Sequence, residues 1–214
     1  MKHKARLCVH GRMQQWGDSY WETYSPAMNM ITARLILAIA KIHNIDSKEI
    51  DFVLSLTQAD LKEDIWMQLP FGFQIYGQNE AESDKWYVLK LNKNLYWLKQ
   101  WSLNWYGKLK VSLVDRDFKP SDIDPCLYIG NGMIILTYVD NCIIVGPSMD
   151  RIDSFVKSMN TGKDNFVLTD KGDINKFLRI EITQLDDNTF KFSQPFMIYH
   201  THLTRRSEER VRCV

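Results

Sequence analysis

Two acidic residues stand where they could act together on bound metal ions. Asp51 belongs to a segment of alternating apolar residues, and Asp140 is followed by Asn141 between two strongly apolar runs. Phosphoryl transfer commonly uses carboxylates that hold two metal ions roughly 3.5–4 Å apart, and rigid strands hold such ligands better than loops. The spacing therefore suggests a two-metal site, provided that the strands carrying Asp51 and Asp140 are neighbours in one sheet.

A purely structural interpretation of the same residues is also open. Asp-Asn is a favoured pair in tight turns because both side chains hydrogen-bond to nearby backbone. A single aspartate on a strand is most often solvated. Residue types alone make this interpretation the commoner one, so the elements around Asp51 and Asp140 have to be considered.

Hydrophobic periodicity predicts the elements in the first half of the chain. Residues 31–43 have helical spacing, residues 50–56 alternate like a strand with Asp51 opposite its more apolar face, and residues 95–113 again have helical spacing. The expected apolar positions of the first helix are Leu35, Ile36, Ile39, Ala40 and Ile42, and those of the second are Leu98, Trp101, Trp105 and Leu109.

Turn residues predict hairpins in the second half. Gly130-Asn131-Gly132 separates two apolar runs and tolerates positive φ, and Asp140-Asn141 forms a polar tip between residues 133–139 and 142–146. Ser148 can cap a helix that Gly162 ends, and residues 177–183 and 189–193 form a further hairpin. The chain is therefore expected to be an α+β domain with an antiparallel sheet packed on helices.

Bulk composition excludes little. With 214 residues, 45% hydrophobic and 25% charged, the chain can bury a core, and its formal net charge of +1 neither supports nor excludes binding to nucleic acid. The four cysteines form no C-x-x-C pair, so structural zinc is not expected. With no leader peptide and no apolar run near the roughly 20 residues that cross a bilayer, we expect an intracellular protein of cytoplasm or nucleus that does not enter a membrane.

The motifs resemble one known family, the reverse transcriptases of Ty1/copia-type retrotransposons. DLKEDIWMQLPFGF at residues 60–73 is the most specific, and Tyr-Val-Asp-Asn at residues 138–141 stands where the family has Tyr-Val-Asp-Asp. The other similar segments, in the family's order, are residues 4–7, 20–26, 95–100, 121–128, 168–173 and 177–182.

This resemblance implies a fold, an activity and a set of site residues. The expected fold is a polymerase fingers-and-palm over residues 1–200, without a full thumb or ribonuclease H, followed by a polar tail at 201–214. The implied activity is RNA-directed DNA polymerisation with two Mg²⁺ ions, deoxynucleotides and a primer on an RNA or DNA template. The implied residues are Asp51, Asp140 and Asn141 for catalysis, the first two as metal ligands; Arg6 and Leu56 for the nucleotide; and Trp97, Lys99 and Gln100 near the template.

Several of these positions depart from the family pattern. Asn141 replaces the second acid of the hairpin and lowers the charge available to a cation, Leu56 replaces a phenylalanine beneath the sugar, and Trp97 replaces a glycine. We therefore expect an impaired or inactive polymerase. The alternatives are a catalytically silent module that still binds nucleic acid, and a relic without a ligand.

Two further features have competing interpretations. Trp97, Trp101 and Trp105 recur every four residues and could stack on bases, but core packing is the preferred interpretation of indoles at this helical spacing. Arg6 lies in a basic N-terminal run that could contact a triphosphate or be merely solvated.

Overall fold

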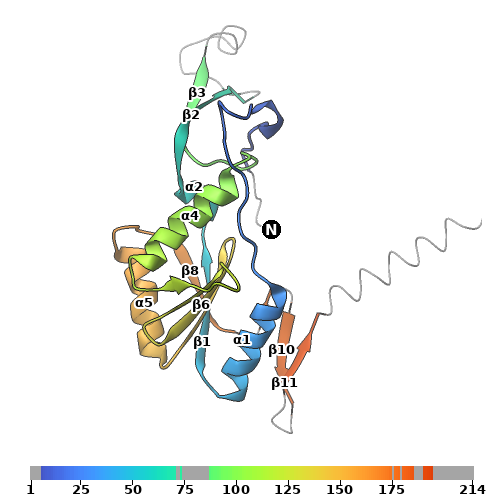
Figure 1. Cartoon of the computed structure of the whole chain (residues 1–214), viewed down its shortest axis with the longest axis vertical. Helices are drawn as coiled ribbons and strands as arrows, with labels where there is room; N and C mark the ends of the chain where they lie inside the picture. The colour runs from blue at the N-terminus through green and yellow to red at the C-terminus, as the bar shows by residue number, and fades with distance from the viewer. Residues whose placement is uncertain are drawn as a thin grey trace, which may run out of the picture.

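A six-stranded antiparallel sheet forms the centre of the protein, in the order β4-β5-β6-β7-β1-β8 (Figure 1). The computed structural model describes residues 6–70, 73, 87–174, 176–178, 180–185 and 190–194. The strands of this sheet are β1 (Asp46–Phe52), β4 (Lys119–Pro120), β5 (Leu127–Gly130), β6 (Met133–Tyr138), β7 (Asn141–Gly146) and β8 (Leu168–Asp173).

Two smaller sheets and a few helices complete the described part of the chain. β2 (Asp60–Gln68) pairs with β3 (Val88–Lys93) in a hairpin that extends away from the main sheet, and β9 (Lys176–Phe177), β10 (Ile180–Gln184) and β11 (Phe190–Ser193) form the third sheet (Figure 1). The helices are η1 (Gly11–Met13), α1 (Met30–Ile42), α2 (Ser55–Gln58), α4 (Trp101–Val114) and α5 (Met149–Thr161). None of them is long and apolar enough to span a membrane.

Both faces of the main sheet are buried at β6 and β7, which explains why these two central strands are apolar at nearly every position. Alternate residues of β7 face opposite ways: Cys142 and Ile144 belong to one core with α4 and α5, whereas Ile143 and Val145 belong to a second core with α1. A sheet covered on both faces needs such a continuous apolar run rather than an alternating one. The expected α+β class with an antiparallel sheet is confirmed.

Local turn chemistry predicted the second half of the chain well. Gly130 pairs with Met133 around Asn131 and Gly132, whose φ angles of 51° and 70° match a hairpin turn that needs positive φ at both central residues. The helix after Ser148 is also confirmed as α5, whose buried residues are Ile152, Phe155, Val156 and Met159. β10 pairs with β11 as expected, but the strand predicted over residues 177–183 is divided into β9 and β10, with Leu178 at a φ of 45° between them. Residues 186–189 and the tail at 201–214 lie outside the described residues.

Three predictions for the first half were wrong in detail. The strand containing Asp51 ends at Phe52 rather than at residue 56, because Leu54 takes a left-handed φ of 51° and starts the short helix α2. The second helix begins at Trp101 rather than at residue 95, since Trp97 has a φ of 74°, which no α-helix accommodates.

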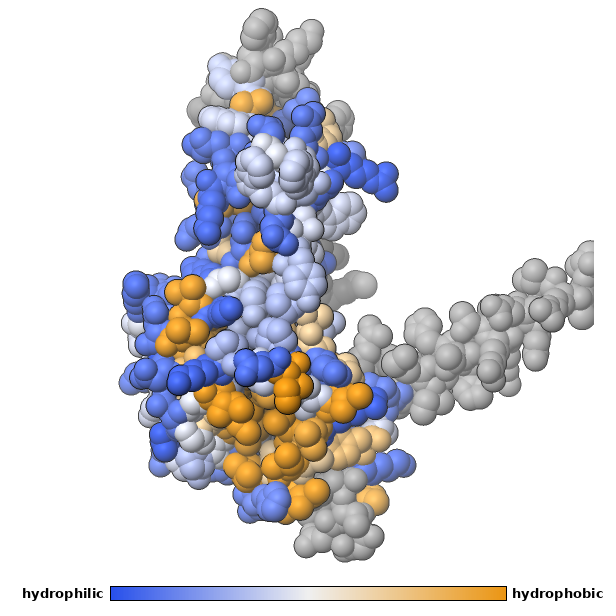
Figure 2. Space-filling view, viewed as in Figure 1, coloured by the Kyte–Doolittle hydropathy of each residue, from blue (hydrophilic) through white to orange (hydrophobic). Residues whose placement is uncertain are grey.

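The third error concerns the face of α1 that packs on the sheet. Its buried residues are Ala33, Ile36, Leu37 and Ala40, spaced i, i+3, i+4 and i+7. Leu35, Ile39 and Ile42, which were expected in the core, are 56%, 37% and 71% exposed. Figure 2 shows apolar residues gathered on the lower part of this face of the molecule, where α1 lies in Figure 1.

Candidate active site

Asp51, Asp140 and Asn141 meet where β1 runs beside β7. Asp51 is the register partner of Asn141, and the Phe52 backbone N–H donates to the Asp140 carbonyl oxygen at 2.7 Å. The strands that carry the two aspartates are therefore neighbours, as the two-metal hypothesis required. Since register partners point to the same face of a sheet, Asp51 and Asn141 share a face, which is opposite to that of Ile50 and Phe52.

The tip of the hairpin differs by one residue from the predicted one. Tyr138 pairs with Asn141, so the two turn residues are Val139 and Asp140 rather than Asp140 and Asn141. Val139 has a φ of 51°, a conformation that is costly for a β-branched side chain. Asn141 is consequently the first residue of β7 and is held by the ladder.

A lysine side chain lies among the polar groups of this face. Lys171 Nζ donates to Asn141 Oδ1 at 2.9 Å, to Glu49 Oε1 at 3.1 Å and to Asp51 Oδ1 at 3.3 Å. Asn141 Nδ2 in turn donates to Asp140 Oδ1 at 2.9 Å. Burial would lower the pKa of Lys171, but the hydrogen bond and charge of Glu49, with a further contribution from Asp51, raise it overall. Lys171 therefore stays cationic at neutral pH.

The donor atoms suit a hard divalent cation in type but are not arranged as a cage for one. Carboxylate and amide oxygens are the ligands that Mg²⁺ accepts, and three of them already converge on the Lys171 ammonium. Within the described residues, no group of three or more His, Cys, Asp or Glu side chains is arranged to hold a metal ion. Of the two aspartates, Asp51 already pairs with Lys171 through Oδ1, and Asp140 Oδ1 accepts from Asn141.

Comparison with known proteins identifies the family. The family described as reverse transcriptase (RNA-dependent DNA polymerase) matches residues 1–203. The chain belongs to this family. No solved structure matches it.

The curated relatives place this reverse transcriptase domain among the copia type. It is 31% identical over 189 residues to the retrovirus-related Pol polyprotein from transposon TNT 1-94 of Nicotiana tabacum, covering 86% of the chain and 14% of the relative. It is 30% identical over 185 residues to that from transposon RE1 of Arabidopsis thaliana, covering 84% and 12%. Against the transposon Ty1-NL2 Gag-Pol polyprotein of Saccharomyces cerevisiae the identity is 23% over 172 residues, covering 78% and 9%. The domain thus spans a small part of each polyprotein.

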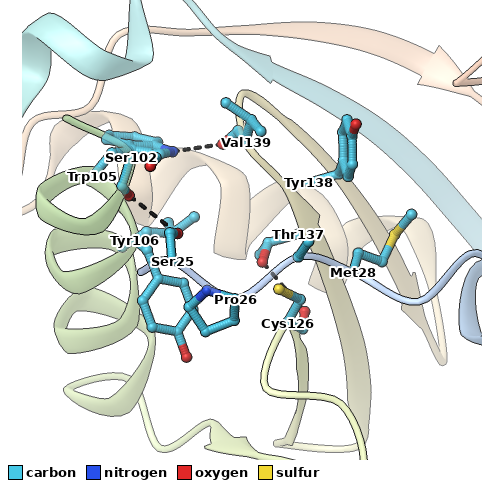
Figure 3. Close-up of a pocket in the computed structure, with 12 residues that line it drawn as sticks. Ser25, Pro26, Met28, Ser102, Trp105, Tyr106, Cys126, Thr137, Tyr138 and Val139 are labelled. Carbon is cyan, nitrogen blue, oxygen red and sulfur yellow. Dashed lines mark hydrogen bonds between the residues drawn. The ribbon is translucent and has the colours of Figure 1, made fainter. Parts of the chain in front are cut away.

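A cavity of about 190 Å³ lies beside the hairpin of this reverse transcriptase domain, between α4, the extended segment 25–28 and the ends of β5 and β6 (Figure 3). Trp105 forms part of its wall, and its indole N–H donates to the Val139 carbonyl oxygen at 2.5 Å (Figure 3). This bond fixes the turn residue that precedes Asp140. Cys126 also lines the cavity, but burial, and then the charge of Asp124, raise the pKa of its thiol to about 11. The thiol is therefore protonated and a poor nucleophile.

The residues expected to contact nucleotide or template are spread over several parts of the domain. Leu56 is only 5% exposed and packs in the core with α4 and α5, and Gln100 is 2% exposed, with its amide donating to the Ser19 carbonyl oxygen. Lys99 Nζ lies 4.7 Å from the ring centroid of Tyr20. The suggested roles of Leu56, Gln100 and Lys99 remain predictions.

Trp97 and Arg6 are, like Lys99, exposed members of that set. Trp97 is 66% exposed and lies outside the helix, whereas Trp105 is in the core and Trp101 is partly buried against it. Core packing, the preferred interpretation of the three tryptophans spaced four residues apart, thus holds for Trp101 and Trp105 but not for Trp97. The Arg6 guanidinium lies 5.6 Å from the ring centroid of Tyr96.

Glu49 and Lys171 were missed at the sequence level. A signal existed in the charges of two segments, because Lys48-Glu49 and Asp51 on one strand face Asp170-Lys171 on another. Opposite charges on paired strands stabilise the pair. This signal is informative only if residues 168–173 form a strand beside β1. The polar sequence of these residues does not predict a strand.

Proposed function

We propose that this chain is the fingers-and-palm part of an RNA-directed DNA polymerase from a copia-type retrotransposon polyprotein, with its active site at Asp51 and Asp140. The observation that carries the proposal is the pairing of Asp51 with Asn141 on adjoining strands, with Asp140 in the turn immediately before. The family match over residues 1–203 supports the same assignment. On this proposal β2 and β3 belong to the fingers and the six-stranded sheet to the palm.

Asp51 and Asp140 would hold Mg²⁺ in this site, with Asn141 as a neutral third ligand. When bound, two such ions lower the barrier for attack by the primer 3′-oxygen and neutralise the leaving pyrophosphate. The protein's own contribution is positional: the ladder fixes Asp51 and Asn141, and the Trp105 bond to Val139 fixes the turn that carries Asp140. Arg6 and Leu56 would receive the nucleotide, and Trp97, Lys99 and Gln100 would lie near the template.

We further propose that polymerase activity is low in this chain. Asn141 supplies no charge to a cation, and the Lys171 ammonium already neutralises Asp51. Trp97 places an exposed indole on a left-handed backbone position where the resemblance indicates glycine. Each feature weakens a different requirement, namely cation binding and close approach of the template.

Primer extension tests the proposal directly. The chain and its Asn141→Asp variant are incubated with an RNA template, a labelled DNA primer, deoxynucleotides and Mg²⁺, and extension is read on a gel. We expect little or no extension by the unaltered chain and measurable extension by Asn141→Asp, because a carboxylate raises the affinity for Mg²⁺. The control is Asn141→Asp with Asp51→Asn, which should be inactive.

A catalytically silent nucleic-acid-binding module is the second candidate. The observation that favours it is the ion pair between Lys171 and Asp51, which leaves the metal site neutralised while the Arg6 and Lys99 side chains remain at the surface. This candidate predicts salt-dependent retention of a primer–template by the unaltered chain and no extension by any Asn141 variant. Extension by Asn141→Asp excludes it.

A further inference from the structure

Lys171 reaches the acidic groups because of an irregularity in the pairing of β8 with β1. Glu49 pairs with Gly172 and Ile50 pairs with Asp170, so Lys171 is the extra residue of a β-bulge. Gly172 has a φ of 77°, as the left-handed residue of a bulge often does. Bulges re-aim side chains, and this one directs Lys171 onto the face that carries Glu49 and Asp51.

The position of the ammonium group is defined by three oxygen acceptors from two strands. Glu49 and Asp51 lie two residues apart on β1 and are 12% and 31% exposed at their side chains, and Asn141 opens β7. All three accept from Lys171 Nζ within 3.3 Å. An ammonium and a hard divalent ion compete for such oxygens, since both need the same lone pairs and the same negative charge.

We propose that Lys171 is a built-in counter-ion that takes the place of a divalent cation at Asp51 and Asn141, so that cation binding requires its displacement. The proposal rests on the proposed function for the identity of the site and adds a mode of autoinhibition to it. Glu49 has a defined part in it: it holds the ammonium over the site without being one of the ligands assigned above.

Two consequences separate this arrangement from an ordinary surface ion pair. Removing the Lys171 ammonium should strengthen binding of a divalent ion, because a positive charge within hydrogen-bond distance of the shared oxygens disappears. Binding of a divalent ion should also release the Lys171 amine from its three acceptors. Both consequences can be measured without nucleotide or primer.

The first experiment titrates Mn²⁺ into the full chain and its Lys171→Met variant by calorimetry, with bound Mn²⁺ confirmed by electron paramagnetic resonance. Lys90→Met is the matched control, because Lys90 is 44% exposed against 39% for Lys171 and pairs with Asp64 in the β2–β3 hairpin. We expect Lys171→Met to bind Mn²⁺ about tenfold more tightly than both other proteins. Equal affinities in the three proteins would overturn the proposal.

The second experiment uses the unaltered chain, so that it decides the matter even if Lys171→Met does not fold. Acetylation of individual lysines is followed by mass spectrometry at increasing Mn²⁺ concentration. Displacement predicts that Lys171 is acetylated faster as Mn²⁺ rises, while the rate at Lys90 is unchanged. A rate at Lys171 that stays constant at Mn²⁺ concentrations where electron paramagnetic resonance shows the ion bound to the chain would contradict the proposal.

The outcome is distinguishable from that of the proposed function. If Asn141→Asp extends a primer but Lys171→Met binds Mn²⁺ no better than the unaltered chain, only the counter-ion role fails. If Lys171→Met binds Mn²⁺ more tightly and no variant extends a primer, the polymerase assignment fails while Lys171 still controls a cation site.

Discussion

Replacing Trp97 by glycine should stabilise the domain, even though it deletes the largest side chain. Trp97 has a φ of 74° and is 66% exposed, so its side chain buries little apolar surface while its Cβ stands in the left-handed region. That region costs a residue other than glycine about 1–2 kcal/mol. The neighbouring backbone keeps it there: the Val9 N–H donates to the Tyr96 carbonyl oxygen at 2.9 Å, and the Lys99 N–H donates to Gln14 Oε1 at 2.8 Å.

The expected size of the effect follows from two opposing terms. Glycine removes the strain of about 1–2 kcal/mol but loses more chain entropy on folding, at a cost of roughly 0.5–1 kcal/mol. Trp97→Gly should therefore be more stable than Trp97→Ala by about 0.75 kcal/mol, the difference between the midpoints of these two ranges, because alanine keeps the strained Cβ. The unaltered chain should resemble the alanine variant, since exposed substitutions usually change stability by no more than about 0.5 kcal/mol.

Urea denaturation followed by far-ultraviolet circular dichroism measures these differences without depending on tryptophan fluorescence. The control is Trp66, which is 57% exposed within strand β2 and has no positive φ. At Trp66 the order should be reversed, with alanine more stable than glycine. If Trp97→Ala proves as stable as Trp97→Gly or more stable, the left-handed strain does not exceed the entropic cost of glycine and the reasoning is wrong.

Two other substitutions test the support of the site and of the core. Trp105→Phe deletes the indole N–H that donates to the Val139 carbonyl oxygen, so it should lower the free energy of unfolding by about 1–3 kcal/mol. It should also speed hydrogen exchange at the Phe52 amide, whereas Trp101→Phe should leave that amide protected. Asp164→Asn tests a charged network: burial raises the pKa of Asp164, but hydrogen bonds from Ser112 and Arg116 and the charge of Arg116 outweigh it and hold the pKa below 3.8. Because the folded-state pKa is lowered, the stabilisation from the Asp164 carboxylate is present above pH 3.8 and is lost as the pH falls through the folded-state pKa. At pH 7 the free energy of unfolding of Asp164→Asn should therefore be lower by about 1–3 kcal/mol. In urea titrations at low pH the two proteins should become equally stable.

The elements that were predicted correctly are those whose turn and cap residues lie close together in the sequence. The Gly130-Asn131-Gly132 hairpin and the helix after Ser148 depend on residues within a few positions of one another, and both are observed. The errors at Leu54 and Trp97 have the opposite origin. Each of these residues takes a positive φ that its side chain disfavours, and the residue types around it do not announce such a conformation, which the surrounding structure imposes.

The candidate site was predictable only in part, and for a related reason. Resemblance drew attention to Asp51, Asp140 and Asn141, and the pairing of β1 with β7 brings them together. Lys171 could not be predicted in the same way, because its approach depends on a bulge between strands about 120 residues apart in sequence. Gly172 is a local sign of a bulge, but which strand lies opposite it, and so which side chains Lys171 reaches, is set by the register of the completed sheet.

The charges that neutralise the site also attach the edge strand β8 to the sheet. On one face, Lys48 pairs with Asp170 at 2.6 Å and with Asp153 of α5; on the other, Lys171 pairs with Glu49 and Asp51. An arrangement of this kind stabilises the sheet edge without a metal ion. A site that used Asp51 for a divalent cation would give up one of these attachments. On the proposed role of Lys171, the same ammonium group serves the stability of the fold and opposes the binding of a divalent cation at Asp51.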